Sequence, residues 1–433
     1  MGPTAAHPAF EENVRREEPA ATPAPEKERS PIAEVLAIRD FRYYWAAQFL
    51  NALVAGISRF AFVWMALEIS SLAAAAALMG LAIGLPGMLV TLPAGAIADR
   101  VDRRRLVMTV GVAGAAVFGA GAFLVFAGLM NLVVGMIIAA GVGTTVAITL
   151  PTFQAMVPQI VPPKRLLNGV AIQNTGQAVS QVLGAVIGGA TIAAFGFGTA
   201  FLLWGAFLLA SSALMIPVKL NPYERSESQA GSLIPSVLRS IRSGLAYGFG
   251  REPLRSLLIV GLFMGTGIGA FGILMPDIAK NELGQDALRT SLLFATMSVG
   301  MTVSSFILAS RKQIGRKGLM HLFAFLCFGP GLLAIGLSNI YLATAGFMIL
   351  WGAAGGVLMT SQRALLQEHT DPAMMGRVMS IVALAFNGML PVAALYVLLM
   401  RSTFGPGDTL AIMGVVSAAG AILIASRSSL RHV

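Results

Sequence analysis

The chain has 433 residues, of which 56% are hydrophobic and 12% are charged, and its mean hydropathy is +0.77. A soluble fold of this length would need more polar side chains to cover its surface, so the composition excludes a soluble globular protein. The formal net charge of +10 could suit nucleic acid, but the basic residues lie in short segments between apolar runs. We therefore expect a polytopic membrane protein whose partner is the lipid bilayer and not nucleic acid.

Residues that bind metals or form disulfides are scarce. The single cysteine, Cys327, excludes an intramolecular disulfide, and the four histidines lack the spacing of metal ligands. There is no nucleotide-binding loop of the GxxxxGK[ST] type. We expect no metal, no cofactor, no direct use of ATP and no enzymatic activity.

Apolar runs of about 20 residues recur from Phe41 onward, and each is long enough to cross the bilayer as a helix. We count twelve, and the longest polar break separates the first six from the last six. Within this break, Ile234 to Phe249 has the periodicity of an amphipathic helix on the membrane surface. The predicted parts are a disordered cytoplasmic tail without a signal peptide (residues 1–37), an N-terminal bundle (38–219), a linker (220–252) and a C-terminal bundle (253–433).

The basic residues predict the orientation of this bundle. With the tail inside and twelve crossings, 26 of the 30 lysines and arginines fall on the cytoplasmic side. The other side holds Lys280, Arg289 and Arg401, and Arg59 lies within a helix. The asymmetry predicts that both termini are cytoplasmic.

The two halves also resemble each other at an offset of about 210 residues. The segment from Phe153 to Ala171 is echoed by Gln362 to Ser380, with Pro163 opposite Pro372. A duplicated six-helix unit predicts two bundles related by a pseudo-two-fold axis.

A charged stretch, GAIADRVDRRR, runs from Gly95 to Arg105 between two apolar segments. It resembles the loop between the second and third helices of major facilitator superfamily transporters, although Asp102 stands where the family often has glycine. The resemblance implies that Gly95 permits close helix packing and that Asp99 links the halves on the cytoplasmic side. The resemblance also implies that Asp99 binds the start of the eleventh helix near Gly376, or pairs with Arg377. Arg100 and Arg104 would then orient Asp99 or bind lipid headgroups.

The first apolar segment carries a polar stripe formed by Gln48, Asn51 and Arg59, which we expect to face a central cavity. Arg59 lies about sixteen residues from the inner end, toward the outer leaflet. Asp277 lies near the outer end of the seventh segment. One hypothesis pairs Arg59 with Asp277 to close the outer side, and the alternative leaves Arg59 extended to the outer surface or bound to carbonyl groups.

The fifth segment carries a second stripe, formed by Asn174, Gln177 and Gln181, which leads into the glycine-rich GAVIGG at residues 184–189. The amides suit either substrate binding or hydrogen bonds between helices, and the glycines let a neighbouring helix approach closely. GAVIGG resembles the fifth-helix motif of drug and proton antiporters, but Ala185 replaces its usual proline.

Across residues 38–426 the order of features resembles the bacterial branch that contains enterobactin exporters and macrolide efflux proteins. It implies a monomer in the bacterial inner membrane that exports a small amphipathic molecule by alternating access, driven by protons. No Asp or Glu lies at mid-membrane depth, so Asp277 and Glu68 are the remaining candidates for coupling. One alternative is that the same fold carries out uptake or lipid flipping. Another is a membrane receptor or assembly factor that does not transport. The sequence does not identify the substrate.

Overall fold

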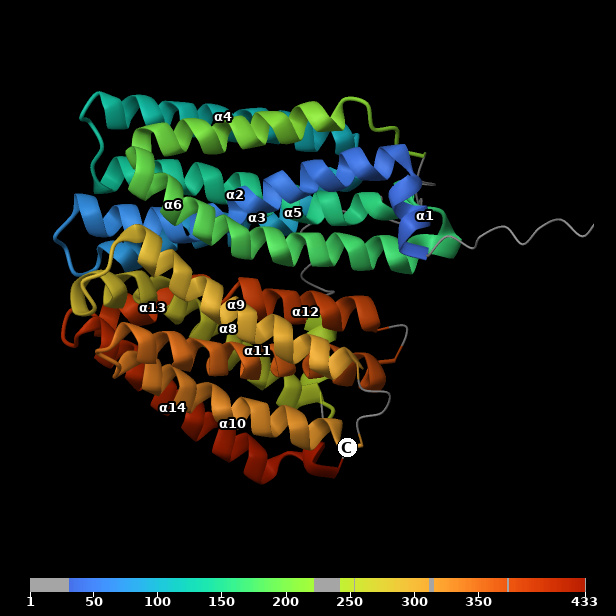
Figure 1. Cartoon of the computed structure of the whole chain (residues 1–433). Helices are drawn as coiled ribbons and strands as arrows, with labels where there is room; N and C mark the ends of the chain where they lie inside the picture. Colours follow the sequence, from blue (N-terminus) through green and yellow to red (C-terminus); the bar gives the residue numbers. More distant parts are fainter. Residues whose placement is uncertain (1–30, 222–241, 253, 311–314, 372–373, 433) are drawn as a thin grey trace, which may run out of the picture.

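The computed structural model describes residues 31–221, 242–252, 254–310, 315–371 and 374–432, and of residues 91–100, 376, 377 and a few others it describes the backbone only. Every regular element in these ranges is a helix, and most of the helices run side by side (Figure 1). The predicted all-α membrane architecture is confirmed.

Six crossings make up the N-terminal half. Its long helix α6 comprises two of them, because Gly196 adopts φ 70° and ψ 175° and turns the chain between them. The elements are α1 (Pro31–Ala37), α2 (Arg39–Ile69), α3 (Ala75–Arg100), α4 (Arg103–Phe126), α5 (Leu132–Ile160), the short η1 (Pro163–Arg165) and α6 (Leu166–Met215).

The C-terminal half supplies the other six crossings. The eleventh crossing is interrupted between α12 and α13, where Pro391 lies in the first turn of the second piece. The elements are α8 (Leu254–Asp277), the π-helix η3 (Ile278–Glu282), α9 (Ala287–Ser310), α10 (Lys317–Gly336), α11 (Tyr341–His369), α12 (Met375–Asn387), α13 (Leu390–Met400), α14 (Pro406–Arg427) and η4 (Ser429–His432).

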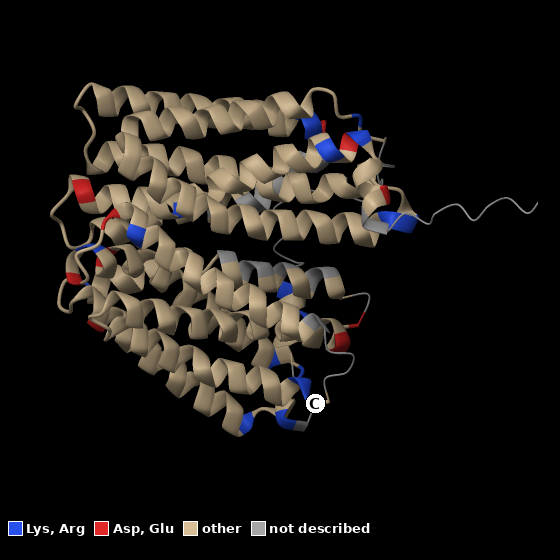
Figure 2. Ribbon diagram, viewed as in Figure 1, with Lys and Arg blue, Asp and Glu red and all other residues tan. Residues whose placement is uncertain are grey.

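The predicted twelve transmembrane helices in two six-helix bundles are therefore present. Nine helices of the described chain are long and apolar enough to cross a membrane, and α6 counts as one of these although it crosses twice. The remaining crossings are α3 and the interrupted pair α12 and α13. Most of the described lysine and arginine residues lie at the end of the bundle where α2 and α4 begin (Figure 2), which we call the basic end. The opposite end, where α2 stops at Ile69, is the far end.

The boundary of the predicted tail needs a correction. Residues 31–37, which the composition assigns to the disordered tail, form helix α1, in which Val35 is buried and Glu34 forms an ion pair with Arg165. Helix α1 packs against the start of both α2 and α6. Residues 1–30 lie outside the described part of the chain, as does most of the predicted amphipathic helix, of which residues 242–249 are helical.

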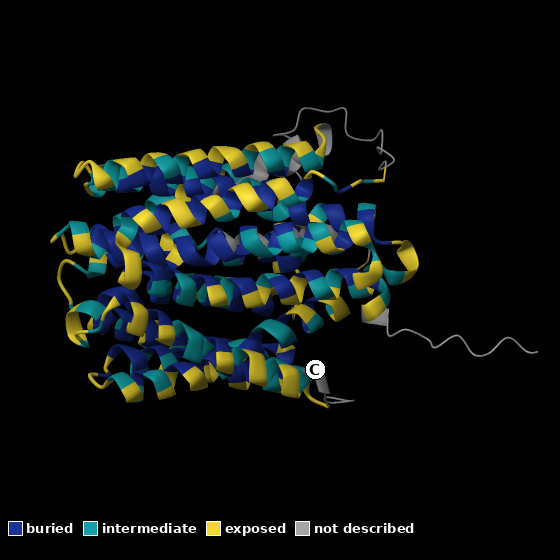
Figure 3. Cartoon of the chain, turned by 45° about the horizontal axis from the view of Figure 1, so that its top comes forward, coloured by how far each residue is buried: buried dark blue, intermediate teal, exposed yellow. Residues whose placement is uncertain are grey.

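Buried apolar residues fill the interior of each half, and many exposed residues lie on outward-facing helix surfaces (Figure 3). Large apolar side chains such as Phe306, Leu342 and Leu350 are strongly exposed. In a bilayer, lipid tails solvate such faces, so their exposure agrees with a membrane setting. Small residues give close packing inside each half. A Cβ atom on Gly184 of α6 would lie 2.4 Å from the carbonyl oxygen of Leu53 on α2.

Candidate functional site

The two halves meet at the far end through closely packed helices. A Cβ atom on Gly189 of α6 would lie 2.5 Å from the carbonyl oxygen of Ala287 on α9. On α3, a Cβ atom on Gly80 would lie 2.7 Å from Ile273 of α8, and one on Gly84 would lie 3.0 Å from Leu390 of α13. The prediction that the glycines of GAVIGG permit close helix approach is confirmed, and one of these approaches joins the halves.

Helix α2 adds aromatic and polar contacts to this far-end seam. The ring of Phe60 lies 5.9 Å from that of Phe294 on α9 in an edge-to-face arrangement. The ammonium group of Lys280, in η3, donates a hydrogen bond of 2.6 Å to the carbonyl oxygen of Leu67 and lies 5.6 Å from the centre of the Trp64 ring. The far end is therefore closed by contacts from several pairs of helices.

Toward the basic end the same helix faces become accessible. Met88 follows Gly80 and Gly84 at intervals of four residues, so it faces the C-terminal half as they do, yet it is 39% exposed. On α6, Gly189 is buried in the seam, whereas Ala178 and Asn174 are exposed. The space between the halves is therefore closed at the far end and accessible toward the basic end.

Arg59 lies where the closed and accessible regions meet. Residues 51–66 of α2 are all buried except Arg59, which is exposed. The adjacent Phe60 touches α9, and Val63, one turn further on, packs into the core of the C-terminal half. Within the described part of the chain, the Arg59 side chain has neither a hydrogen bond nor an ion pair. Because protein surrounds α2 at this level, the exposed Arg59 faces the space between the halves.

The rest of the predicted stripe on α2 is placed differently. Gln48 is 1% exposed, and Asn51 is also buried, with its side-chain oxygen accepting a 2.9 Å hydrogen bond from the hydroxyl of Thr149 on α5. The expectation that the whole stripe faces a cavity is therefore wrong for these two residues in this conformation. The physical reason is the tight packing of α2 against α5 and α6, which encloses the stripe on the side of its own half.

The buried Gln48 amide lacks hydrogen-bond partners within the described structure. Neither its nitrogen nor its oxygen finds a hydrogen-bond partner in the described structure, although the side chain is buried. A buried amide without partners is costly, so this position differs from an ordinary packed glutamine.

The second stripe lies in the accessible region. Asn174 is exposed, and Gln177 and Gln181 are partly exposed on α6. The amide of Gln154 on α5 donates a long hydrogen bond of 3.4 Å to the side-chain oxygen of Gln177. The backbone of Gln181 packs against Gly56, three residues before Arg59. The amides thus form a polar row on α6 that rises from the basic end to within one turn of the level of Arg59.

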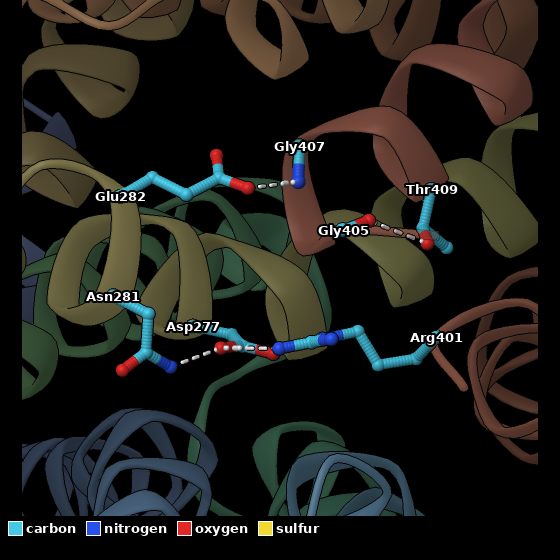
Figure 4. Close-up of polar contacts among 7 residues, drawn as sticks. All are labelled: Asp277, Asn281, Glu282, Arg401, Gly405, Gly407 and Thr409. Carbon is cyan, nitrogen blue, oxygen red and sulfur yellow. Dashed lines mark hydrogen bonds and ion pairs between the residues drawn. The ribbon is translucent and has the colours of Figure 1, made fainter. Parts of the chain in front are cut away.

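Asp277 has a different partner from the one predicted. Its carboxylate accepts a 2.8 Å hydrogen bond from Nε of Arg401 and a 2.6 Å bond from the Asn281 amide (Figure 4). Asp277 is 1% exposed and Arg401 is 18% exposed. The hypothesis of an Arg59–Asp277 pair is therefore wrong for this structure, because the carboxylate is held within its own half by Arg401, which follows α13. Near this pair, Glu282 accepts a 2.9 Å bond from the Gly407 amide at the start of α14.

At the basic end, the charged loop ties helices of the N-terminal half together. Asp102 caps α4 by accepting hydrogen bonds from the backbone amides of Arg104 and Arg105 at 2.9 and 3.2 Å. The guanidinium of Arg103 donates to the Ala155 carbonyl of α5 at 2.8 Å, and that of Arg104 donates to the Ile216 carbonyl, which follows α6. The side chains of Asp99, Arg100 and Arg377 and the surroundings of Gly95 lie outside the described part of the chain, so their predicted latch stays a prediction.

The comparison with protein families decides what these two bundles are. The family model of the Major Facilitator Superfamily matches residues 44–394. The chain belongs to the major facilitator superfamily. In this family two six-helix bundles enclose a substrate path at their interface, which is where Arg59 and the α6 amides lie.

The relatives of this major facilitator chain are distant. It is 22% identical to a macrolide efflux protein A of Streptococcus pyogenes over 84% of this chain and 90% of that protein. It is 24% identical to an enterobactin exporter of Shigella boydii, over 78% and 79% of the two chains. An uncharacterized transporter of the superfamily from Bacillus subtilis is 22% identical over 61% of this chain. That match covers 63% of the length of the Bacillus protein. The predicted resemblance to efflux proteins of these kinds is confirmed.

Solved structures show the same fold. The nucleoside transporter NupG matches with a TM-score of 0.67 and 12% identity, over 90% of this chain and 98% of that one. At this identity the likeness concerns the arrangement of the helices alone.

Proposed function

We propose that this protein is a secondary active transporter of the bacterial inner membrane, which exports a small amphipathic molecule from the cytoplasm by alternating access in exchange for protons. The observation that carries this proposal is the interface between the halves, which is packed at the far end and accessible toward the basic end. Two bundles that meet at one end only are one of the two states that alternating access requires. The export direction is supported by the names of the macrolide efflux protein and the enterobactin exporter.

The basic end is assigned to the cytoplasm by its charge. Lysines and arginines concentrate in cytoplasmic segments of membrane proteins, and Figure 2 shows most of them at this end. Both termini then lie inside, and the accessible side of the interface is open to cytoplasmic substrate. The protein acts as a monomer, with a substrate path through its own two bundles.

The proposed substrate contacts are Arg59 and the amides of α6, namely Asn174, Gln177 and Gln181. Gln48 and Asn51 lie behind them in the N-terminal half, and the unpaired amide of Gln48 is free to bind once α2 moves. In the opposite state, Asp99 and Arg377, with Gly95, Arg100 and Arg104 nearby, would close the basic end as the family resemblance implies.

We assign proton coupling to two carboxylates near the far end, those of Glu68 on α2 and Asp277 on α8. Glu68 accepts a 2.6 Å hydrogen bond from the Trp64 indole, and Asp277 holds Arg401. Protonation of Asp277 would neutralise the charge that binds Arg401 and so loosen α13 from α8. A proton entering at this end would thereby favour a different arrangement of the interface.

The experiment uses inside-out vesicles with a transmembrane pH gradient and a panel of siderophores, macrolides and lipophilic cations. Release of lumenal protons on addition of a compound, reduced in Asp99→Asn and Asp277→Asn, supports proton-coupled export. Flux of a compound without any proton movement contradicts the coupling. Binding of a compound without flux contradicts transport and favours a receptor.

A further inference from the structure

Arg59 lies in a membrane-crossing helix and has no counter-charge within the described part of the chain. An unpaired guanidinium at this depth is expensive, and such residues persist where they meet a charged partner during function. The exposed Arg59 has no hydrogen bond or ion pair within the described structure. A partner from outside the chain would supply the missing negative charge.

The neighbouring carboxylates do not supply it. Glu68, two and a half turns further along α2, accepts the indole hydrogen bond of Trp64. Asp277 of α8 is held by Arg401 and Asn281, and Glu282 of η3 binds the first turn of α14. These three carboxylates are thus engaged elsewhere, and Arg59 stays available on the accessible side of the seam.

The surroundings of Arg59 suit a ligand with both polar and apolar parts. The amide row of α6 reaches the level of Gly56 through Gln181, so hydrogen-bonding groups approach Arg59 from the basic end. Met88 on α3 adds an exposed apolar side chain that faces the same space. A guanidinium presents five N–H donors in a plane, which matches the paired oxygens of a carboxylate, sulfonate or phosphate.

We propose that the transported molecule is an amphipathic organic anion whose charged group binds Arg59 at the closed end of the accessible space. This inference rests on the proposed function, since it names the chemical class of the substrate for that site. The anion enters from the basic end, passes the amides of α6 and is held where the seam between the halves begins.

The test is equilibrium binding of two matched probes to the purified full chain in nanodiscs. The probes are 1-naphthaleneacetate and 1-naphthaleneacetamide, which share their ring system and differ in charge. Three variants are compared with the unmodified chain. Arg59→Gln removes the charge, Arg59→Lys keeps it, and Arg289→Gln removes an exposed charge at the far end. Losing one charge-assisted contact is expected to weaken binding about tenfold or more.

The expected result is that the anion binds at least about tenfold more tightly than the amide. The preference is lost in Arg59→Gln, largely kept in Arg59→Lys and unchanged in Arg289→Gln. Unchanged binding of the amide to Arg59→Gln shows that the variant is folded. Equal binding of the two probes, no binding of the anion, or an anion preference that survives in Arg59→Gln overturns the inference.

Flux of the same probes in inside-out vesicles separates this inference from the proposed function. Flux without a preference for the anion leaves export standing and overturns the anion site. Anion binding that depends on Arg59, without flux of either probe, leaves the site standing and contradicts export.

Discussion

The side chain of Lys280 bridges the two halves of the molecule, because its Nζ atom donates a 2.6 Å hydrogen bond to the carbonyl oxygen of Leu67 at the end of α2. Lys280 belongs to the π-helix η3, and π-helical turns are frequent at functional sites. The same ammonium group faces the Trp64 ring, whose indole is hydrogen-bonded to Glu68. This bridge adds a hydrogen bond and a cation–π contact to the packed seam at the far end.

Replacing Lys280 by methionine should loosen the far end. Methionine keeps much of the apolar stem but loses the hydrogen bond and the cation–π contact, each of which is worth about 1 kcal/mol. The reporter is Ser291 of α9, which is buried in the far-end seam against Gly189 of α6. The measurement is labelling of Ser291→Cys, in a Cys327→Ser background, by an impermeant maleimide applied from the far-end side. We expect faster labelling in Lys280→Met and no change in the control Arg289→Gln. Equal labelling rates in Lys280→Met and its parent would show that this bridge does not close the seam.

The Asp277–Arg401 pair should show energetic coupling. Removing either charge leaves the other almost buried and unpaired, so we expect Asp277→Asn and Arg401→Gln each to lower the free energy of unfolding by about 2 kcal/mol. Because Arg401 is 18% exposed, this loss in the free energy of unfolding is smaller than the loss expected for a fully buried ion pair. The double variant should lose less than the sum of the two, as measured by thermal unfolding in detergent. Strict additivity would mean that the pair does not act as a unit.

Gly189 should tolerate no side chain. An added Cβ atom would lie 2.5 Å from the Ala287 carbonyl oxygen of the other half, so Gly189→Ala must push α6 and α9 apart. We expect a loss of about 1 to 3 kcal/mol in stability, together with increased labelling of Ser291→Cys from the far-end side. Gly119→Ala is the matched control, since no atom lies within 4 Å of its added Cβ. If both glycine variants behave alike, the close approach at Gly189 is not needed for closure.

The link between Asp371 and the segment before α8 should depend on pH. Hydrogen bonds from Tyr247 and Arg251 lower the pKa of Asp371, and the Arg251 contact measures 2.8 Å. A carboxylate with a depressed pKa in the folded state stabilises that state above the pKa of the unfolded chain and loses this effect as the pH falls through the folded value. The stability difference between the unmodified chain and Asp371→Asn should therefore be constant from pH 6 to 8 and shrink below about pH 4. Thermal unfolding across this pH range measures it, and a difference that grows in acid would contradict the assignment.

Much of the fold could be predicted from the sequence because the bilayer imposes a simple rule on it. A crossing needs about 20 apolar residues with all backbone groups bonded internally, so the helices are visible as apolar runs. The interruption of the eleventh crossing before Pro391 was not predicted, although Asn387 and Gly388 stand at the break in an otherwise apolar run. Helix α1 was missed because its seven residues are too short to show a period, and its order comes from contacts with α2 and α6.

The site was harder to predict because pairing depends on three-dimensional contacts. Arg59 and Asp277 both lie toward the far end, but Arg401, which follows α13, is the residue that reaches Asp277. The sequence offered one signal for this partner, since Arg401 is one of only three basic residues on its side of the predicted topology. Gln48 and Asn51 share a helix face with the region near Arg59, yet the packing of α5 and α6 covers them.

The central claim is that the interface is sealed at the far end and open at the basic end, with the basic end in the cytoplasm. Labelling of Met88→Cys by an impermeant maleimide, in the Cys327→Ser background and without substrate, tests it most directly. Met88 faces the C-terminal half on the accessible side of the seam. We predict rapid labelling in inside-out vesicles and little in right-side-out vesicles. Labelling from the opposite side, or protection of Met88→Cys in inside-out vesicles, would contradict the account.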